Sequence, residues 1–194
     1  MSRPIRALLL LLLVSGCGSA EFSAPRDLDN ACSIVSQRPN YLNAMRRTEQ
    51  RWGVPVPVQM ATIYQESKFI GNARTPRTYT LGIIPMGRVS SAYGYSQALD
   101  GTWDEYKAKT GSWRAKRDDI DDATDFMGWY MAETQAVLGI STGDARNQYL
   151  AYHEGRTGYR RGSYNQKQWL MRVAGEVAQR ATIYEAQLLA CGQR

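Results

Sequence analysis

The sequence predicts a single globular, mainly α-helical domain with one small β or loop excursion. Apolar residues recur at helical spacing along most of the chain, and Gly or Pro stands at the ends of several of these segments. Residues 79–97, rich in Gly, Pro, Ser and Tyr, lack that spacing and account for the excursion. Removing a leader of sixteen residues from 194 leaves 178, which is enough for one hydrophobic core.

Residues 1–16 have the features of a secretion signal and are set aside from the fold. Arg3 and Arg6 form a short basic region, and a leucine-rich apolar run follows from 7 to 14. The run is shorter than the roughly 20 residues that a membrane-spanning helix needs. The residues that follow the run favour a lipoprotein signal. The alternatives are an ordinary secretory signal and a membrane anchor.

Those residues are Val14-Ser15-Gly16-Cys17, which resemble a bacterial lipobox. The resemblance implies that Cys17 is acylated and becomes the mature N-terminus, with 17–27 as a lipidated tether. Gly18 in place of Asp resembles the pattern of lipoproteins sorted to the outer membrane. We therefore expect a periplasm-facing lipoprotein held by a lipid anchor in the outer membrane.

The helical segments have recognisable ends. Pro39 suits the first turn of a helix, and Gly53 and Gly139 suit helix termination. The acidic cluster at 118–122 suits the start of a helix, where negative charge is favourable. The expected helices span 27–37, 39–52, about 57 to 66, from the acidic cluster to 139, 144–154 ending at Gly155, and about 166–189. An apolar stripe on the last of these helices, Trp169 included, is interpreted as core.

Cys32 and Cys191 remain once Cys17 is assigned, and outside the cytoplasm they can form one disulfide. It would join the start of the domain to its end, the alternative being two free buried thiols. Two distant cysteines and a lone His153 do not form a ligand cluster, so we expect no metal.

The formal charge is +6, and it falls to +4 when Arg3 and Arg6 leave with the signal. A modest basic excess suits an anionic partner such as the cell wall or a membrane surface. The basic residues are dispersed and form no recognition motif, so we expect no nucleic-acid partner. We expect the protein to be a monomer.

Three segments carry the chemistry: Gln65-Glu66-Ser67-Lys68-Phe69, Gly94-Tyr95-Ser96-Gln97 and Ala151-Tyr152-His153-Glu154-Gly155. In this order they resemble the three motifs of the SLT-type lytic transglycosylases. The resemblance implies a lysozyme-like α+β fold over 28–194 and cleavage of bacterial peptidoglycan. It departs from the family at two positions of the second segment and at His153 and Glu154 of the third.

Glu66 is the candidate catalytic residue. It lies near the expected end of its helix, where the helix dipole disfavours a further negative charge. Apolar neighbours such as Ile63 and Phe69 remove water from the carboxyl, and both effects raise its pKa. A carboxyl that stays protonated near neutral pH is what a glycosidic general acid requires. The alternative is a surface glutamate at a helix end.

The resemblance assigns supporting roles to five further residues. Ser67 and Gln97 are expected to hold substrate or orient the acid, Ser67 alternatively bonding its own helix backbone. Tyr152 is expected to donate a hydrogen bond to Glu66. Tyr95 and His153 are candidates beside the substrate, the alternatives being a turn residue and an ordinary surface or core histidine.

The expected reaction is cleavage of the β-1,4 bond between N-acetylmuramic acid and N-acetylglucosamine, leaving 1,6-anhydromuramoyl ends. One carboxylate would act as acid and then as base, so no cofactor is required. The first alternative is a hydrolytic muramidase, which needs a second carboxylate; Asp100, Asp104 and Glu154 are its candidates. The second is a non-catalytic wall-binding lipoprotein.

Overall fold

A computed structural model describes residues 22–80 and 83–194. The predicted secretion signal, Cys17 and the first part of the predicted tether lie outside these residues. Within the described ranges, no helix combines the length and the apolar character that crossing a membrane requires.

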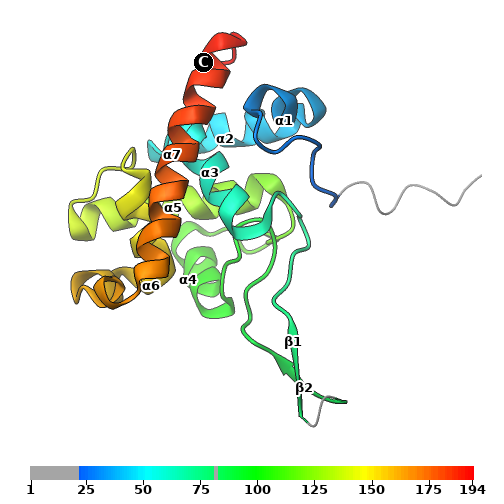
Figure 1. Cartoon of the computed structure of the whole chain (residues 1–194), viewed down its shortest axis with the longest axis vertical. Helices are drawn as coiled ribbons and strands as arrows, with labels where there is room; N and C mark the ends of the chain where they lie inside the picture. Colours follow the sequence, from blue (N-terminus) through cyan, green and yellow to red (C-terminus); the bar gives the residue numbers. More distant parts are fainter. Residues whose placement is uncertain (1–21, 81–82) are drawn as a thin grey trace, which may run out of the picture.

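The described residues form seven α-helices, a short 3-10 helix and one antiparallel two-stranded sheet, which confirms the mainly α-helical fold (Figure 1). The elements are α1 (Ala31–Gln37), α2 (Pro39–Trp52), α3 (Val56–Ser67), β1 (Arg77–Thr80), β2 (Ile84–Arg88), α4 (Asp100–Thr110), α5 (Ile120–Leu138), α6 (Ala145–Arg160), η1 (Ser163–Gln166) and α7 (Gln168–Ala190).

The ends of the helices follow from local chemistry. Asn30 and Asp119 accept hydrogen bonds from backbone N–H groups in the first turns of α1 and α5. Gly53 and Gly139 take left-handed conformations after α2 and α5, as expected of glycine at a helix end.

Two details differ from the prediction. Helix α4 has little amphipathic pattern, burying just Trp103 and Tyr106 of its eleven residues, and the sequence did not indicate it. Gly155 does not end α6 but kinks it, with φ 70° and ψ 155°, and the helix resumes to Arg160. Glycine tolerates this conformation because it has no Cβ.

Helix α3 is the central element of the core. Each residue from Val56 to Ile63 is buried, so this helix is covered on all sides. It contacts α2, α5, α6 and α7, which together surround it. The core residues lie between Ala31 and Leu188, so a chain beginning at Phe22 contains all of them.

The small sheet is a hairpin that projects away from the helical body (Figure 1). Strands β1 and β2 pair in antiparallel register, with Arg77 opposite Arg88 and a bulge between Thr78 and Tyr79. All four residues of β1 are exposed. The predicted β excursion is therefore confirmed, but it lies outside the core.

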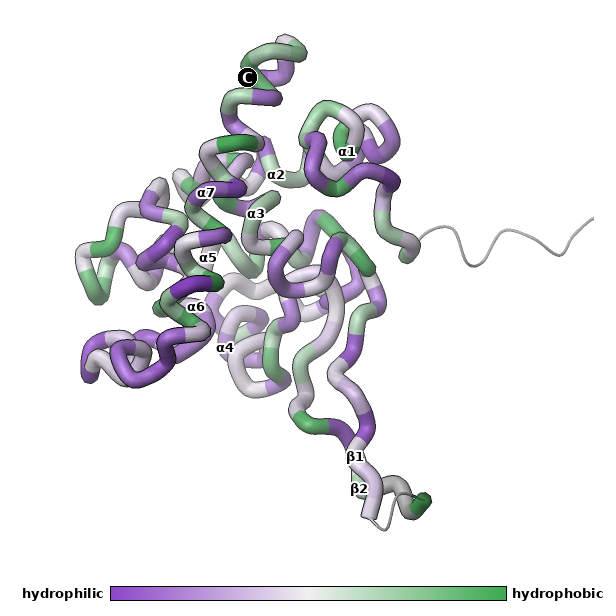
Figure 2. The backbone as a smooth tube through the Cα atoms, viewed as in Figure 1, coloured by the Kyte–Doolittle hydropathy of each residue, from purple (hydrophilic) through white to green (hydrophobic). Residues whose placement is uncertain are grey.

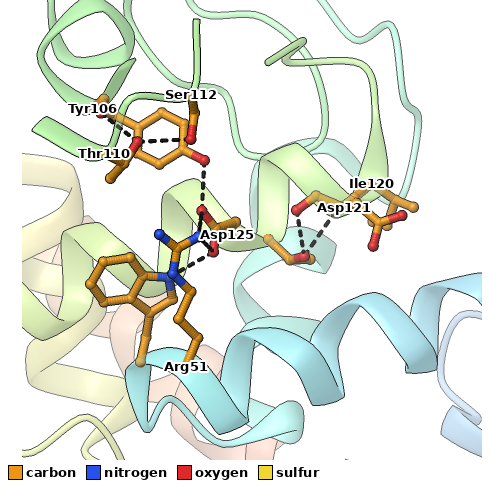
Figure 3. Close-up of polar contacts among 9 residues, drawn as sticks. Arg51, Tyr106, Thr110, Ser112, Ile120, Asp121 and Asp125 are labelled. Carbon is orange, nitrogen blue, oxygen red and sulfur yellow. Dashed lines mark hydrogen bonds and ion pairs between the residues drawn. The ribbon is translucent and has the colours of Figure 1, made fainter. Parts of the chain in front are cut away.

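Asp125 of α5 joins three helices through one carboxylate (Figure 3). It accepts hydrogen bonds from Arg51 and Trp52 at the end of α2, at 3.0 and 2.7 Å, and from the Tyr106 hydroxyl of α4 at 2.7 Å. Its side chain is 19% exposed, so the donors of Trp52 and Tyr106 have little water to replace the carboxylate.

Replacing Asp125 with Ala should lower the free energy of unfolding by about 3 kcal/mol, because it leaves partly buried donors without an acceptor. Replacing Asp121 with Ala is the matched control. Asp121 pairs with Arg47 at an exposed site, where an ion pair contributes at most about 1 kcal/mol. Urea denaturation of the two variants should separate them, and equal losses would contradict the role of Asp125.

The predicted disulfide between Cys32 and Cys191 is present and joins α1 to the end of α7 across 159 residues. Replacing both cysteines with Ser should lower the free energy of unfolding by about 2–5 kcal/mol, since the bridge restricts the unfolded chain. Thermal denaturation measures the loss. Alkylation of the unreduced native protein provides the second check, and full labelling of both thiols would contradict the bridge.

Candidate active site

Glu66 lies in the last turn of α3, one residue before the helix ends. The two residues that follow the helix, Lys68 and Phe69, both have positive φ values, of 52° and 59°. Such a turn is unfavourable for residues other than glycine and needs support from the surrounding structure. Phe69 provides that support, because its ring is fully buried and stacks on Tyr41 with centroids 6.0 Å apart. The position of Glu66 is thus fixed by the core.

The carboxyl of Glu66 titrates near neutral pH. Burial raises its pKa from 4.5 to about 7, while a hydrogen bond from Tyr149 and the nearby charge of Lys68 act in the opposite direction. Glu66 nevertheless retains part of its surface exposed. The group is therefore sheltered enough to hold a proton and open enough to meet a ligand.

Tyr149 of α6 lies beside Glu66, where its phenol favours the charged carboxylate and lowers the pKa of Glu66, and the sequence prediction missed it. Its side chain is buried, and burial together with the neighbouring carboxyl raises the pKa of its phenol far above the usual value. Tyr149 lies three residues before Tyr152, so both face the same side of one helix. The three-residue spacing from Tyr152 was the sequence feature that could have identified Tyr149.

Tyr152 does not donate to Glu66 as predicted. Its hydroxyl donates to the backbone carbonyl of Ser96 at 2.7 Å, and a phenol has one proton to give. The ring packs edge-on against Tyr130, with centroids 5.2 Å apart. Tyr152 thereby ties α6 to the Gly94-Tyr95-Ser96-Gln97 segment, and burial together with the nearby Glu66 carboxylate raises the pKa of its phenol.

Gln97 holds the shape of that same segment. It has a φ of 49°, and its side-chain amide donates to the carbonyls of Ala73 and Gly94 at 3.0 and 2.8 Å. Gly94 is required here, because a Cβ at this position would lie 1.9 Å from the carbonyl oxygen of Arg117. Gln97 is therefore placed to shape the loop, and its amide is engaged with the protein's own backbone.

Tyr95 and Ser67 are also turned toward the protein. Tyr95 is buried, and its hydroxyl lies 2.9 Å from that of Tyr41. Ser67 is buried and donates to the carbonyl of Ile63 at 3.2 Å, which is the backbone bond considered as its alternative. Both side chains therefore bond to the protein's own groups.

Glu154 is held in an ionised state by its neighbours. Burial opposes its charge, but hydrogen bonds from Lys167 (2.7 Å) and Ser163 and a contact with His153 (3.1 Å) lower its pKa to about 2. Its side chain is 4% exposed. Glu154 therefore joins the kinked end of α6 to η1 and the start of α7, a structural role.

His153 is exposed at this end of α6, and its ring lies edge-on to Trp169 with centroids 5.2 Å apart. Trp169 was expected in the core, but it lies in the first turn of α7 and is 49% exposed, and the buried residues of that helix begin at Leu170.

Asp100 and Asp104 lie on α4, away from Glu66. Asp100 pairs with Arg117 at 2.8 Å, and Asp104 pairs with Lys107 at 2.9 Å. All four side chains line one surface hollow, to which Glu66 does not contribute. The structure does not bring these carboxylates together with Glu66.

Comparison with known families gives one match. The sequence model described as the transglycosylase SLT domain matches residues 5–191, nearly the whole chain. No curated protein matches the sequence.

Replacing Tyr149 with Phe should lower the turnover of a Glu66-dependent reaction by about tenfold, because a hydrogen bond to a charged group contributes about 1.5–3 kcal/mol. The bond favours the charged form of Glu66, so its loss raises the pKa further. A general acid loses activity as the pH rises through its pKa. The fall in activity at high pH, expected near pH 7 in the wild type, should therefore shift to higher pH in the variant.

Replacing Tyr152 with Phe is the matched control, because its hydroxyl serves the carbonyl of Ser96. Its pH profile should keep the fall in activity near pH 7 even where turnover is lower. The same upward shift in both variants would contradict the assignment of Tyr149 as the partner of Glu66.

Proposed function

The chain belongs to the transglycosylase SLT domain family, whose members act on peptidoglycan, and from that premise we propose that it is a lytic transglycosylase using Glu66 as its single acid and base. The supporting observation is the Glu66 carboxyl with a pKa raised to about 7, at the end of a helix whose residues from Val56 to Ile63 are all buried. Such a group holds a proton in the ground state and can regain one after giving it away.

In the first step, protonated Glu66 donates to the oxygen that links N-acetylmuramic acid to N-acetylglucosamine. The bond from this oxygen to C1 of the muramoyl residue breaks, and the electron pair leaves with the oxygen. Positive charge develops at C1, and the substrate's own 2-acetamido oxygen stabilises it, so no protein nucleophile is needed. Tyr149 stabilises the glutamate that forms.

In the second step, ionised Glu66 removes the proton from the C6 hydroxyl of the same muramoyl residue. The C6 oxygen attacks C1 and closes a 1,6-anhydro ring, so no water is consumed. Glu66 is left protonated for the next cycle. The carboxyl must therefore hold a proton in the first step and accept one in the second, which requires a pKa near neutrality. Burial raises the pKa of Glu66 to about 7.

The hydrolytic alternative requires a second carboxylate to activate water. Glu154 is committed to Lys167 and Ser163 and has a lowered pKa, which suits a fixed charge. Asp100 and Asp104 are paired with Arg117 and Lys107 in a separate hollow. These arrangements favour the transglycosylase over the hydrolase.

The location of the protein is part of the same proposal. Val14-Ser15-Gly16-Cys17 supports acylation of Cys17, and Gly18 supports the outer membrane as its destination. A periplasm-facing enzyme on a lipid anchor would lie beside its peptidoglycan substrate. The disulfide between Cys32 and Cys191 suits that oxidising compartment.

Replacing Glu66 with Gln should lower activity on isolated sacculi by about 10²-fold or more, since the amide keeps the volume but cannot deliver a proton. Replacing Asp104 with Asn is the matched control and should retain activity. Mass spectrometry of the products should show 1,6-anhydromuramoyl ends that resist borohydride. Near-normal turnover of the Glu66→Gln protein, or reducible muramic acid ends, would contradict the proposal.

A further inference from the structure

The β1–β2 hairpin contributes no buried residue from β1 and extends well beyond the helices (Figure 1). An isolated two-stranded hairpin is at best marginally stable in water, and it normally packs against a third strand or a helix. Hydrogen bonds around Thr75 hold the base of the hairpin together. The Thr75 carbonyl accepts a hydrogen bond from the Arg88 side chain at 2.6 Å, and the Thr75 hydroxyl donates to the carbonyl of Ser90 and accepts from its N–H. Its outer part has no packing partner among the described residues.

That outer part is apolar. Ile83 is 78% exposed and Met86 64%, and Tyr79 is more than half exposed beside them. Figure 2 shows hydrophobic colour at the far end of the hairpin, away from the helical body. Single exposed apolar residues are ordinary, but a group of them on one projecting tip is typical of an interaction surface.

A pair of arginines lies behind the tip. Arg77 and Arg88 are direct cross-strand partners, and like charges in this position repel. Neither forms an ion pair with a carboxylate among the described residues. The sequence contains no Asp or Glu from Ser67 to Leu99. The hairpin therefore has local positive charge that an external anion would neutralise.

The segment that leads into the hairpin starts beside the N-terminal end of the described domain. The backbone N–H of Gly71 donates to the carbonyl of Phe22 at 3.1 Å, and the chain reaches β1 six residues later. Cys17 is five residues before Phe22, a separation that spans at most about 18 Å. A membrane that held Cys17 would lie within that distance of Phe22 and Gly71, where the chain starts toward the hairpin.

We propose that the β1–β2 hairpin docks on a membrane surface that contains anionic phospholipids. The apolar tip, formed by Tyr79, Ile83 and Met86, enters the boundary between headgroups and acyl chains. Arg77 and Arg88 bind lipid phosphates at the level of the headgroups. An apolar edge backed by cations is the arrangement that binds such interfaces. The proposal goes beyond the enzymatic reaction and does not require acylation of Cys17.

The test uses the domain beginning at Phe22, which has the whole hydrophobic core but no lipid. Vesicles of phosphatidylcholine alone, or mixed with phosphatidylglycerol, are floated with this domain. It should float with the mixed vesicles. The Ile83→Ser, Met86→Ser double variant should lose about tenfold or more in vesicle affinity. The Arg77→Gln, Arg88→Gln double variant should lose about tenfold and its preference for phosphatidylglycerol.

The matched control replaces two exposed apolar residues elsewhere, Val137 and Leu189, with Ser. It should float like the wild type, and all variants should keep their thermal stability. Co-sedimentation with sacculi shows whether the hairpin instead binds the cell wall. The proposal is overturned if the wild-type domain does not float, if the hairpin variants float like the control, or if they lose sacculus binding alone.

Discussion

The burial of α3 on all sides is the constraint on which the rest of the structure depends. A helix covered by α2, α5, α6 and α7 cannot shift or rotate without opening the core. Glu66 lies where this helix ends, and the buried ring of Phe69 fixes the turn that follows. The packing of the hydrophobic core thus holds the Glu66 carboxyl in a largely buried position, and this burial raises its pKa to about 7.

Most of the motif residues build the site instead of facing a ligand. Gln97 and Gly94 shape one loop, and Tyr152 joins that loop to α6 through the carbonyl of Ser96. Ser67 and Tyr95 are turned into the protein. A motif can therefore point to a candidate site while most of its side chains serve the geometry of the backbone there.

Two glutamates show how the environment separates similar side chains. Burial dominates at Glu66 and favours the proton, whereas Lys167 and Ser163 outweigh burial at Glu154 and favour the charge. The first is suited to proton transfer, and the second to holding η1 and α7 against the end of α6. Chemical type alone would not distinguish them.

The sequence by itself determined the helical class, the ends of α2 and α5 at Gly53 and Gly139, and the pairing of Cys32 with Cys191, and its motifs made Glu66 the candidate acid. These follow from local periodicity, backbone preference and short motifs, which neighbouring residues carry. Tertiary structure decided that Tyr149 lowers the pKa of Glu66 while the Tyr152 hydroxyl donates to Ser96, and that Glu154 is paired with Lys167. Hydrogen-bond partners depend on how helices that are distant in the sequence pack together. The spacing of residues along the chain does not say which side chains that packing brings into contact.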